Sequence, residues 1–103
     1  MAELSVEIER SEASCVLVRL VGELDKLSAP QLSRRFDELV AEGYDTVVVD
    51  AERLTFCDSS GLWALIQLQR NLRARGGMFR LIQVQGVLRR VLDVTGLSAA
   101  FPA

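Results

Sequence analysis

The stretch Thr46-Val47-Val48-Val49-Asp50 decides the fold class of this chain. Three consecutive β-branched residues are typical of a strand that is covered on both faces, as in an α/β sheet. After a short connection, Asp58-Ser59-Ser60-Gly61 follows and opens a helix that starts near Ser60. A hydroxyl thus lies at a helix N-terminus beside a carboxylate, where unpaired N–H groups and the helix dipole favour negative charge. The segment is therefore a good place to carry a phosphate.

On both sides of this strand, the hydrophobic pattern predicts further elements, in the order β-β-α-β-α-β-α along the chain. The predicted strands are residues 4–8, 15–21, 46–50 and 79–84, and the predicted helices lie at residues 28–43, 60–75 and 87–95. A polar turn at residues 10–13 makes the first two strands an antiparallel hairpin. Right-handed crossovers then place the second, third and fourth strands parallel in one sheet. We expect a single α/β domain over residues 1–103.

The turns and caps follow from short local signals. Residues 22–25 (Gly-Glu-Leu-Asp) are predicted to turn the chain after the second strand. Ser28 can cap the first helix, with Gln31 completing a capping box and Pro30 in the first turn. Gly43, Gly76 and Gly96 follow the three helices as stop signals. The inner faces of the helices are Leu32, Phe36, Leu39 and Val40; Leu62, Leu65, Ile66 and Leu72; and Leu88, Val91 and Leu92.

Composition excludes several classes of function. The chain has 103 residues and a net charge of −2, which gives no electrostatic case for nucleic acid. It has no histidine, so Ser-His-Asp triads, Cys-His dyads and histidine-based zinc sites are excluded. The longest apolar stretches are strand-length, so no transmembrane helix is predicted and we expect no direct membrane insertion. Cys15 and Cys57 are expected to be small buried apolar residues of a cytoplasmic protein, with no metal or cofactor.

Two loops are predicted to meet at one edge of the sheet. The turn ending at Asp25 and the segment starting at Asp58 both follow the carboxyl ends of parallel strands, an edge where ligands and partners commonly bind. Asp25, Asp58, Ser59 and Ser60 should therefore cluster. Each also has a simple structural interpretation: Asp58 as a helix cap, the serines as first-turn residues, Gly61 as a packing glycine, and Asp25 as a turn residue.

Taken together, three motifs resemble the STAS domain of the anti-sigma factor antagonist (anti-anti-sigma factor) family. They are Gly22-Glu23-Leu24-Asp25; the run from Val47 through Leu54, Phe56 and Cys57 to Asp58-Ser59-Ser60-Gly61-Leu62; and Arg89-Arg90-Val91-Leu92 leading to Thr95-Gly96-Leu97. The three motifs occur in this order, and together the match covers nearly the whole chain. The resemblance implies a mixed β-sheet of four to five strands packed with three or four α-helices.

The resemblance also implies a function. In this family the unphosphorylated antagonist binds an anti-sigma factor that is a serine kinase of the GHKL type, and binding releases the sigma factor. The kinase phosphorylates the serine directly after the aspartate, which is Ser59 here, and a PP2C-type phosphatase reverses the modification. ATP and magnesium belong to the kinase, so this chain is expected to be a substrate and binding module rather than an enzyme. Asp25, Asp58, Ser60 and Gly61 would share the partner-binding site with Ser59.

Other interpretations remain open at this stage. Trp63 stands where small or aliphatic residues are more usual, and it is either wedged at the core boundary or a partner-contact anchor. Many relatives continue into a further helix after the position of Ala103, and its absence would leave surface for a partner or a homodimer contact. The main alternative function is a STAS subunit of a transporter or lipid-trafficking complex without a phosphoserine cycle. A small-molecule or nucleotide-sensing domain has little support, because the sequence has neither a glycine-rich loop nor a basic cluster on the edge of the sheet that carries Asp25 and Asp58.

Overall fold

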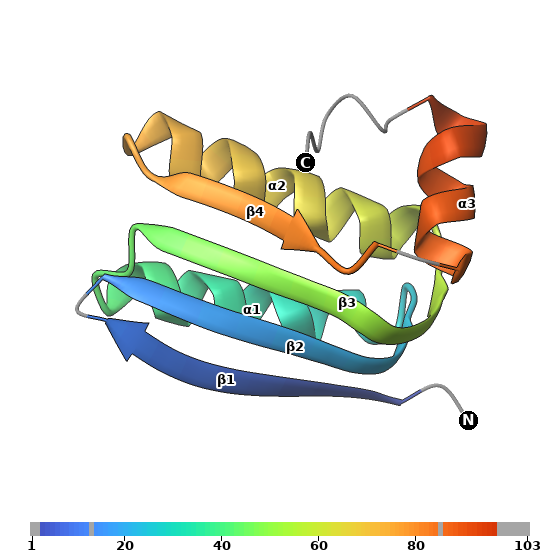
Figure 1. The fold of residues 1–103 in the computed structure, drawn as a ribbon, viewed down its shortest axis with the longest axis horizontal. Coiled ribbons are helices and arrows are strands. Elements are labelled where there is room, and N and C mark those ends of the chain that lie inside the picture. Colours follow the sequence, from blue (N-terminus) through green and yellow to red (C-terminus); the bar gives the residue numbers. More distant parts are fainter. Residues whose placement is uncertain (1–2, 13, 85, 97–103) are drawn as a thin grey trace.

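The computed structural model describes residues 3–12, 14–84 and 86–96, and Figure 1 shows their arrangement. The predicted element order is confirmed. The elements are β1 (Leu4–Glu12), β2 (Cys15–Leu24), α1 (Ala29–Ala41), β3 (Thr46–Cys57), α2 (Ser59–Ala74), β4 (Met78–Ile82) and α3 (Gly86–Thr95). Leu97, which ends the third motif, lies outside the described residues.

The described strands form one mixed sheet in the order β1-β2-β3-β4. β1 pairs antiparallel with β2, whereas β2 with β3 and β3 with β4 are parallel pairs. This confirms both the predicted hairpin and the predicted parallel strands. The described region has four strands and three helices, which is the smaller of the two predicted sizes.

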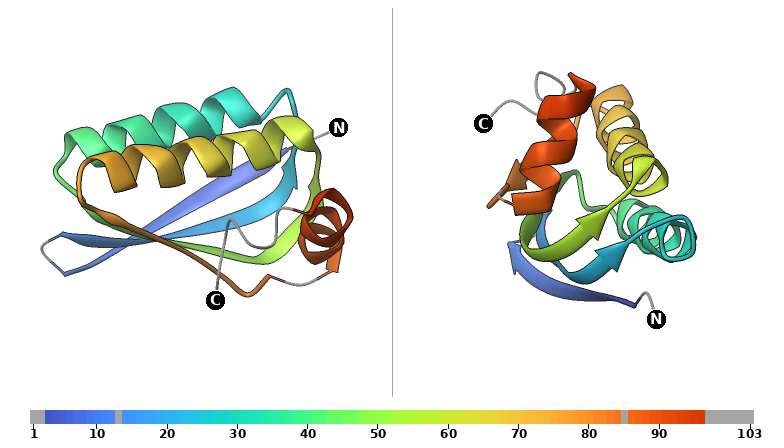
Figure 2. Two further views of the ribbon diagram at one scale, coloured as in Figure 1. Left: turned by 90° about the horizontal axis from the view of Figure 1, so that it is seen from above. Right: turned by 90° about the vertical axis from the view of Figure 1, so that its right-hand side faces the viewer.

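Two helices cover one face of the sheet. Seen from above in Figure 2, α1 and α2 lie side by side on the same side of the strands. The strand residues beneath them are fully buried, as are the inner-face leucines of both helices: Val16, Val18, Leu20, Val47, Val49, Leu32, Leu39, Leu65 and Leu72. Burial of each such side chain stabilises the fold by about 1.5–3 kcal/mol.

The opposite face departs from the prediction. Helices α1 and α2 leave it open, and Val48 on that face is half-buried, whereas its neighbours Val47 and Val49 are buried. The third described helix, α3, packs against β3 at the carboxyl end of the sheet (Figure 1). Leu88 and Leu92 of α3 are buried there.

Strand β3 is longer than predicted, because it continues from Asp50 to Cys57 instead of ending in a short connection. The register shows why the sequence pattern hid this. Between Arg19 and Leu24 of β2 the strand advances five residues, while its partner β3 advances seven, from Asp50 to Cys57. Each of the two register shifts inserts one extra residue into β3, as a β-bulge does.

The two bulges change the spacing of buried residues in this half of β3. Ala51, Leu54 and Cys57 are buried at intervals of three residues, with exposed pairs between them. Regular strands bury every second residue, so this spacing does not match a strand template. The bulged half of β3 leads directly into α2.

Three local predictions were also wrong. β1 runs to Glu12, so the turn predicted at residues 10–13 is shorter, and Ala13 lies outside the described residues. β2 continues through Leu24, so only Asp25 of the predicted turn at residues 22–25 lies beyond the strand. Ser28 precedes α1 but makes no side-chain cap hydrogen bond, so no capping box forms.

Candidate functional site

The ends of β2 and β3 meet at the carboxyl edge of the sheet, at the right-hand end of Figure 1. The N–H of Asp58 donates to the carbonyl of Leu24 at 3.2 Å. The N–H of Lys26 donates to Oδ2 of Asp58 at 3.1 Å. The loop at residues 25–28 and the start of α2 are therefore joined directly, as the parallel topology predicted.

Asp58 caps α2 and joins the two loops at the same time. Its backbone is extended, and its Oδ1 accepts a hydrogen bond from the N–H of Gly61 at 3.0 Å. Oδ2 accepts the bond from Lys26. An aspartate cap stabilises a helix by about 1 kcal/mol, because it satisfies an N–H that has no intrahelical partner. Each carboxylate oxygen of Asp58 thus serves a different segment of the site.

Asp25 organises the loop at residues 25–28. Its Oδ1 accepts hydrogen bonds from the N–H groups of Leu27 at 2.9 Å and Ser28 at 3.0 Å. The N–H of Ser28 is the main reason that the pKa of Asp25 lies below its ordinary value; partial desolvation opposes this effect. Asp25 therefore carries a negative charge in the loop and holds the loop's shape.

The Ser28 hydroxyl completes this loop, which explains the missing capping box. Its Oγ lies 2.9 Å from the carbonyl of Glu23 and 3.2 Å from Oδ1 of Asp25, and it also accepts the N–H of Asp25 at 2.9 Å. A hydroxyl has one proton, so the shorter distance favours donation to Glu23. Ser28 is buried, and its side chain supports the loop instead of α1.

Ser59 and Ser60 differ in their access to solvent. Both lie in the first turn of α2, but Ser59 is exposed and Ser60 is partly buried. Of the two hydroxyl groups, that of Ser59 is therefore the easier to reach from solvent.

Gly61 is buried against the end of β2. A Cβ at this position would lie 2.5 Å from Cγ of Leu24 and 2.7 Å from its carbonyl oxygen. No side chain fits without displacing backbone, so this glycine sets how closely α2 approaches β2. Gly61 itself is buried, so it shapes this edge only through the position of the first turn of α2.

Trp63 projects from α2, one turn beyond Ser59, and 49% of it is exposed. The guanidinium carbon of Arg70 lies 5.2 Å from the centre of its ring, within the range of a cation–π interaction. Of the two sequence interpretations, the structure therefore favours an exposed side chain over a wedge at the core boundary.

Sequence reasoning missed two further apolar residues near Asp58. Leu27 is 75% exposed in the loop that Lys26 ties to Asp58, and Phe56 is 41% exposed on β3, two residues before Asp58. We call Leu27, Phe56 and Trp63 the apolar rim. Large exposed apolar side chains beside a polar site are a common feature of protein-binding surfaces. Phe56 was identified only as part of the second motif, and its exposure was not predicted, because the bulges hide which residues of β3 face outward.

Cys57 precedes Asp58 but has no chemical role at this edge. It is buried, and desolvation, followed by the charge of Asp58, raises the pKa of its thiol to about 12. Its Sγ lies 3.5 Å from the carbonyl oxygen of Asp58. Among the described residues, no group of acidic or cysteine side chains is arranged to hold a metal ion. Within the described region, no helix is long and apolar enough to cross a membrane.

The sequence of this chain is similar to one family model and to several curated proteins. A family model described as "Mlab, STAS domain" matches residues 8–101. The chain is 29% identical over 100 residues to the anti-sigma F factor antagonist of Paenibacillus polymyxa, covering 96% of this chain and 85% of that protein. It is 28% identical over 94 residues to the anti-sigma-B factor antagonist of Bacillus subtilis (strain 168), covering 91% and 84%.

Solved structures of one relative represent two states. The anti-sigma factor antagonist SpoIIAA in its unphosphorylated form superposes with a TM-score of 0.82 at 28% identity, covering 95% of this chain and 86% of that chain. The Bacillus SpoIIAA in its phosphorylated form gives a TM-score of 0.76 at the same identity, covering 95% and 89%. The same fold thus accommodates both states of that protein.

Proposed function

This chain belongs to the STAS domain family, and we propose that it is an anti-sigma factor antagonist controlled by phosphorylation of Ser59. In its unphosphorylated form it binds an anti-sigma factor that is a GHKL-type serine kinase, and this releases the sigma factor. A PP2C-type phosphatase returns the phosphorylated form to the cycle. The cycle is cytoplasmic, and the chain contributes a binding surface and a modification site rather than catalysis.

The observation that carries this proposal is the setting of the Ser59 hydroxyl. Ser59 is the exposed first residue of a 16-residue helix and follows the capping Asp58 directly. The N–H of Gly61 is taken by Asp58, and that of Leu62 bonds the carbonyl of Asp58 at 3.0 Å. The first-turn N–H groups of Ser59 and Ser60 remain for a phosphate, whose charge the helix N-terminus favours. The free domain should therefore tolerate phosphorylation.

In a complex, the same phosphate would oppose binding. It adds about −1.5 to −2 charges next to the carboxylate of Asp58. At a docked surface both groups lose water, and like charges that are held together can cost several kcal/mol. That corresponds to a loss of affinity of roughly a hundredfold or more. Phosphorylation thus changes partner binding more than it changes the fold.

The other site residues have supporting roles in this proposal. Asp25 and Asp58 hold the loop and the helix start in a fixed relation, Gly61 sets the depth of α2, and Ser60 lies beside the modified residue. The apolar rim supplies contact area for the kinase, with Trp63 as its largest side chain.

The decisive experiment incubates the protein with the cognate kinase and ATP and locates phosphate by mass spectrometry. The parent and the Ser60→Ala control should be phosphorylated at Ser59, whereas Ser59→Ala should not be modified. Binding to the kinase, measured by calorimetry, should weaken at least a hundredfold for Ser59→Asp. Modification of Ser60 alone would overturn the site assignment.

A subunit of a transporter or lipid-trafficking complex makes a different prediction. Such a protein would bind its membrane partner equally well with Ser59→Ala and Ser59→Asp, and no cognate kinase would modify it. That pair of results would replace the antagonist proposal.

A further inference from the structure

The face of the sheet away from α1 and α2 is partly apolar and open among the described residues. Sheets built from parallel strands usually have both faces covered, because each face carries apolar residues. Here β2, β3 and β4 are parallel, and α3 reaches only their carboxyl end. The central apolar side chains of the open face are only half-buried: Leu17, Val21, Val48 and Ile82.

The register arranges the side chains of this face in rows that cross all four strands. The first row runs from β1 to β4 through Glu9, Leu17, Val48 and Arg80. The second row runs in the same direction through Glu7, Arg19, Asp50 and Ile82. Partners in a row are cross-strand neighbours and point to the same side of the sheet.

Charge is distributed unevenly along these rows. The β1 edge is acidic, with Glu7 and Glu9 both exposed, while Arg80 is exposed on β4 at the other edge. Glu9 bonds Arg19 at 2.9 Å, but Arg80 has no ion pair within the described residues. The open face is therefore acidic along its β1 edge and carries a positive charge, Arg80, at its β4 edge.

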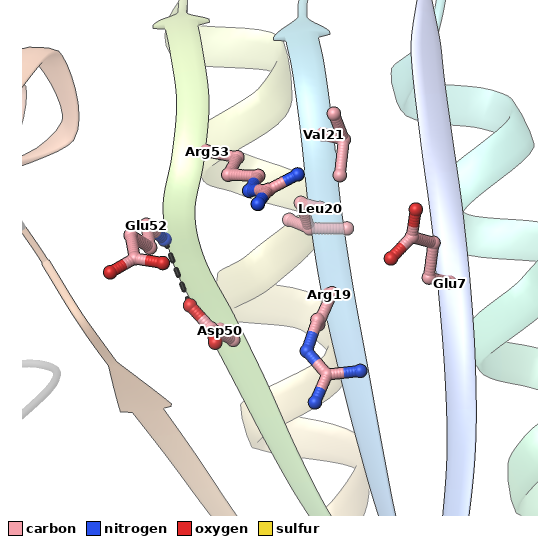
Figure 3. Close-up of a pocket in the computed structure, with 7 residues that line it drawn as sticks. All are labelled: Glu7, Arg19, Leu20, Val21, Asp50, Glu52 and Arg53. Carbon is pink, nitrogen blue, oxygen red and sulfur yellow. Dashed lines mark hydrogen bonds between the residues drawn. The ribbon is translucent and has the colours of Figure 1, made fainter.

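The face is also hollowed rather than flat. A hollow of about 260 Å³ is lined by residues of β1, β2 and β3. Figure 3 shows Arg19 on β2 and Arg53 on β3 beside it, with Glu7 across from them on β1. Acidic and basic side chains line it together: Glu7, Arg19, Asp50, Glu52 and Arg53, with Leu20 and Val21. Mixed charge does not suit a small anion or cation, but it suits a protein surface of matching charge pattern.

We propose that this open face binds a second copy of the chain through a two-fold axis parallel to the strands. Such an axis places β1 over the partner's β4 and β2 over the partner's β3, while each row lies over the same row of the other copy. An interface of this kind is self-complementary, because every contact occurs twice.

The rows match under this operation. Glu9 lies over the partner's Arg80, and Leu17 lies over the partner's Val48. In the second row, Arg19 lies over the partner's Asp50. Glu7 lies over the partner's Ile82, a pair without electrostatic attraction. Two attractive charge pairs and one apolar pair therefore form, each in two copies.

The other in-plane two-fold axis, across the strands, is disfavoured. It would place β1 over the partner's β1, so that Glu7 and Glu9 meet the same acidic edge. Like charges across an interface cost free energy and suppress that arrangement. The acidic edge thus selects one orientation of the partner.

The size of the face indicates a weak, reversible dimer. Four strands at about 4.8 Å and six residues at about 3.3 Å give a footprint of roughly 19 by 20 Å. Specific interfaces usually bury about 800 Å² on each partner, so this one lies below the usual size. We expect a dissociation constant in the micromolar range or above. The face lies opposite α2, so the dimer leaves Ser59 accessible and does not depend on the proposed function.

Sedimentation velocity of the full chain over a concentration series tests the dimer. The parent should shift from monomer to dimer, and Arg80→Glu should weaken the dimer about tenfold or more, because it places like charges over Glu9 twice. Combining Arg80→Glu with Glu9→Arg exchanges the charges and should strengthen association relative to Arg80→Glu alone, although Glu9→Arg also removes the ion pair with Arg19. Arg34→Glu on α1, at the opposite face, is the matched control with the same change in net charge.

The possible results distinguish the proposed pairing of β1 with the partner's β4 from a monomeric protein and from an effect of net charge. Stronger association of the double exchange than of Arg80→Glu alone, together with an unaffected Arg34→Glu control, would establish the pairing of β1 with the partner's β4. A parent that remains monomeric at all concentrations would overturn the proposal. So would a dimer that Arg80→Glu and Arg34→Glu weaken equally, because that response reflects net charge alone. Circular dichroism of each variant verifies that it is folded.

Discussion

The two ends of the sheet are built in different ways. At the carboxyl edge, side chains make the connections: Asp58 joins the loop to α2, while Asp25 and Ser28 shape the loop. At the opposite end, backbone groups connect the strands, and an exposed ion pair at 3.1 Å links Arg10 to Glu42. The N–H groups of Asp45 and Thr46 bond the carbonyl of Ser14 at 3.1 and 3.0 Å, and the N–H of Met78 bonds the carbonyl of Asp45 at 2.8 Å.

The two ends therefore differ in how far their connections depend on particular side chains. Backbone connections do not depend on which side chain a residue carries, provided that it fits. Connections through carboxylates depend on charge and respond to pH or to a neighbouring phosphate. At the carboxyl edge, the carboxylates of Asp25 and Asp58 make such charge-dependent connections.

The largest expected contrast concerns the two cysteines, one at each end. Cys57 is buried at the carboxyl edge with a pKa of about 12, so at pH 8 only about one thiol in ten thousand is ionised. Cys15 begins β2 at the backbone-built end and is only partly buried. With Ellman's reagent, one thiol per native chain should react, and Cys15→Ser should remove that reaction. The second thiol should react once denaturant unfolds the chain. Equal rates for both thiols in the native protein would contradict the buried position of Cys57.

A second contrast tests close packing at the backbone-built end. A Cβ on Gly77 would collide with the carbonyl oxygen of Asp45, which is backbone and cannot rotate away. We expect Gly77→Ala to lower the free energy of unfolding by about 2–4 kcal/mol, measured by urea denaturation. Gly76→Ala is the neighbouring control: its Cβ would meet nothing within 4 Å, but its φ of +76° costs about 1–2 kcal/mol. A larger loss for Gly76→Ala than for Gly77→Ala would show that space is not what limits this turn.

Aspartate substitutions compare the two ends directly. Asp58→Ala removes the helix cap and the acceptor for Lys26, so it should cost about 1–2 kcal/mol of stability. Asp45→Ala keeps the backbone connections and loses only an exposed hydrogen bond from Thr46. Its cost should stay within about 0.5 kcal/mol. Chemical denaturation measures both, and equal losses would remove the distinction between the two ends.

The smallest expected effect is a pH dependence confined to the carboxyl edge. Hydrogen bonds, first of all from the N–H of Ser28, hold the pKa of Asp25 in the folded protein below 3.8. The carboxylate therefore stabilises the fold above pH 3.8, and this contribution is lost as the pH falls through the lowered folded-state pKa. In urea denaturation between about pH 6 and pH 3, Asp25→Asn should show a shallower loss of stability than the parent. Superimposable pH profiles would exclude this role for Asp25.

The elements with regular patterns could be predicted from the sequence, and the edge of the sheet only in part. Val47 and Val49 identified β3, and parallel topology brought the loops of Asp25 and Asp58 together. The end of β3 could not be predicted, because two bulges move the buried Leu54 off the two-residue period and leave Arg53 and Thr55, which lie on that period, exposed. The capping box at Ser28 failed for a local reason: its hydroxyl bonds the carbonyl of Glu23, five residues earlier, instead of an N–H of α1.

The order of the strands in space is also their order in the chain. β1, β2, β3 and β4 follow one another across the sheet, so no strand is inserted between two others. A ribosome-bound chain can therefore add each strand to the growing edge as it emerges, starting from the β1–β2 hairpin. Only the β1–β2 hairpin pairs residues close in sequence; the parallel pairs join residues 31 to 33 positions apart, and such non-local pairing slows folding. The described hydrogen bonds that shape the segment around Ser59 come from the end of β2, the loop after it and α2, so they do not require β4 or α3.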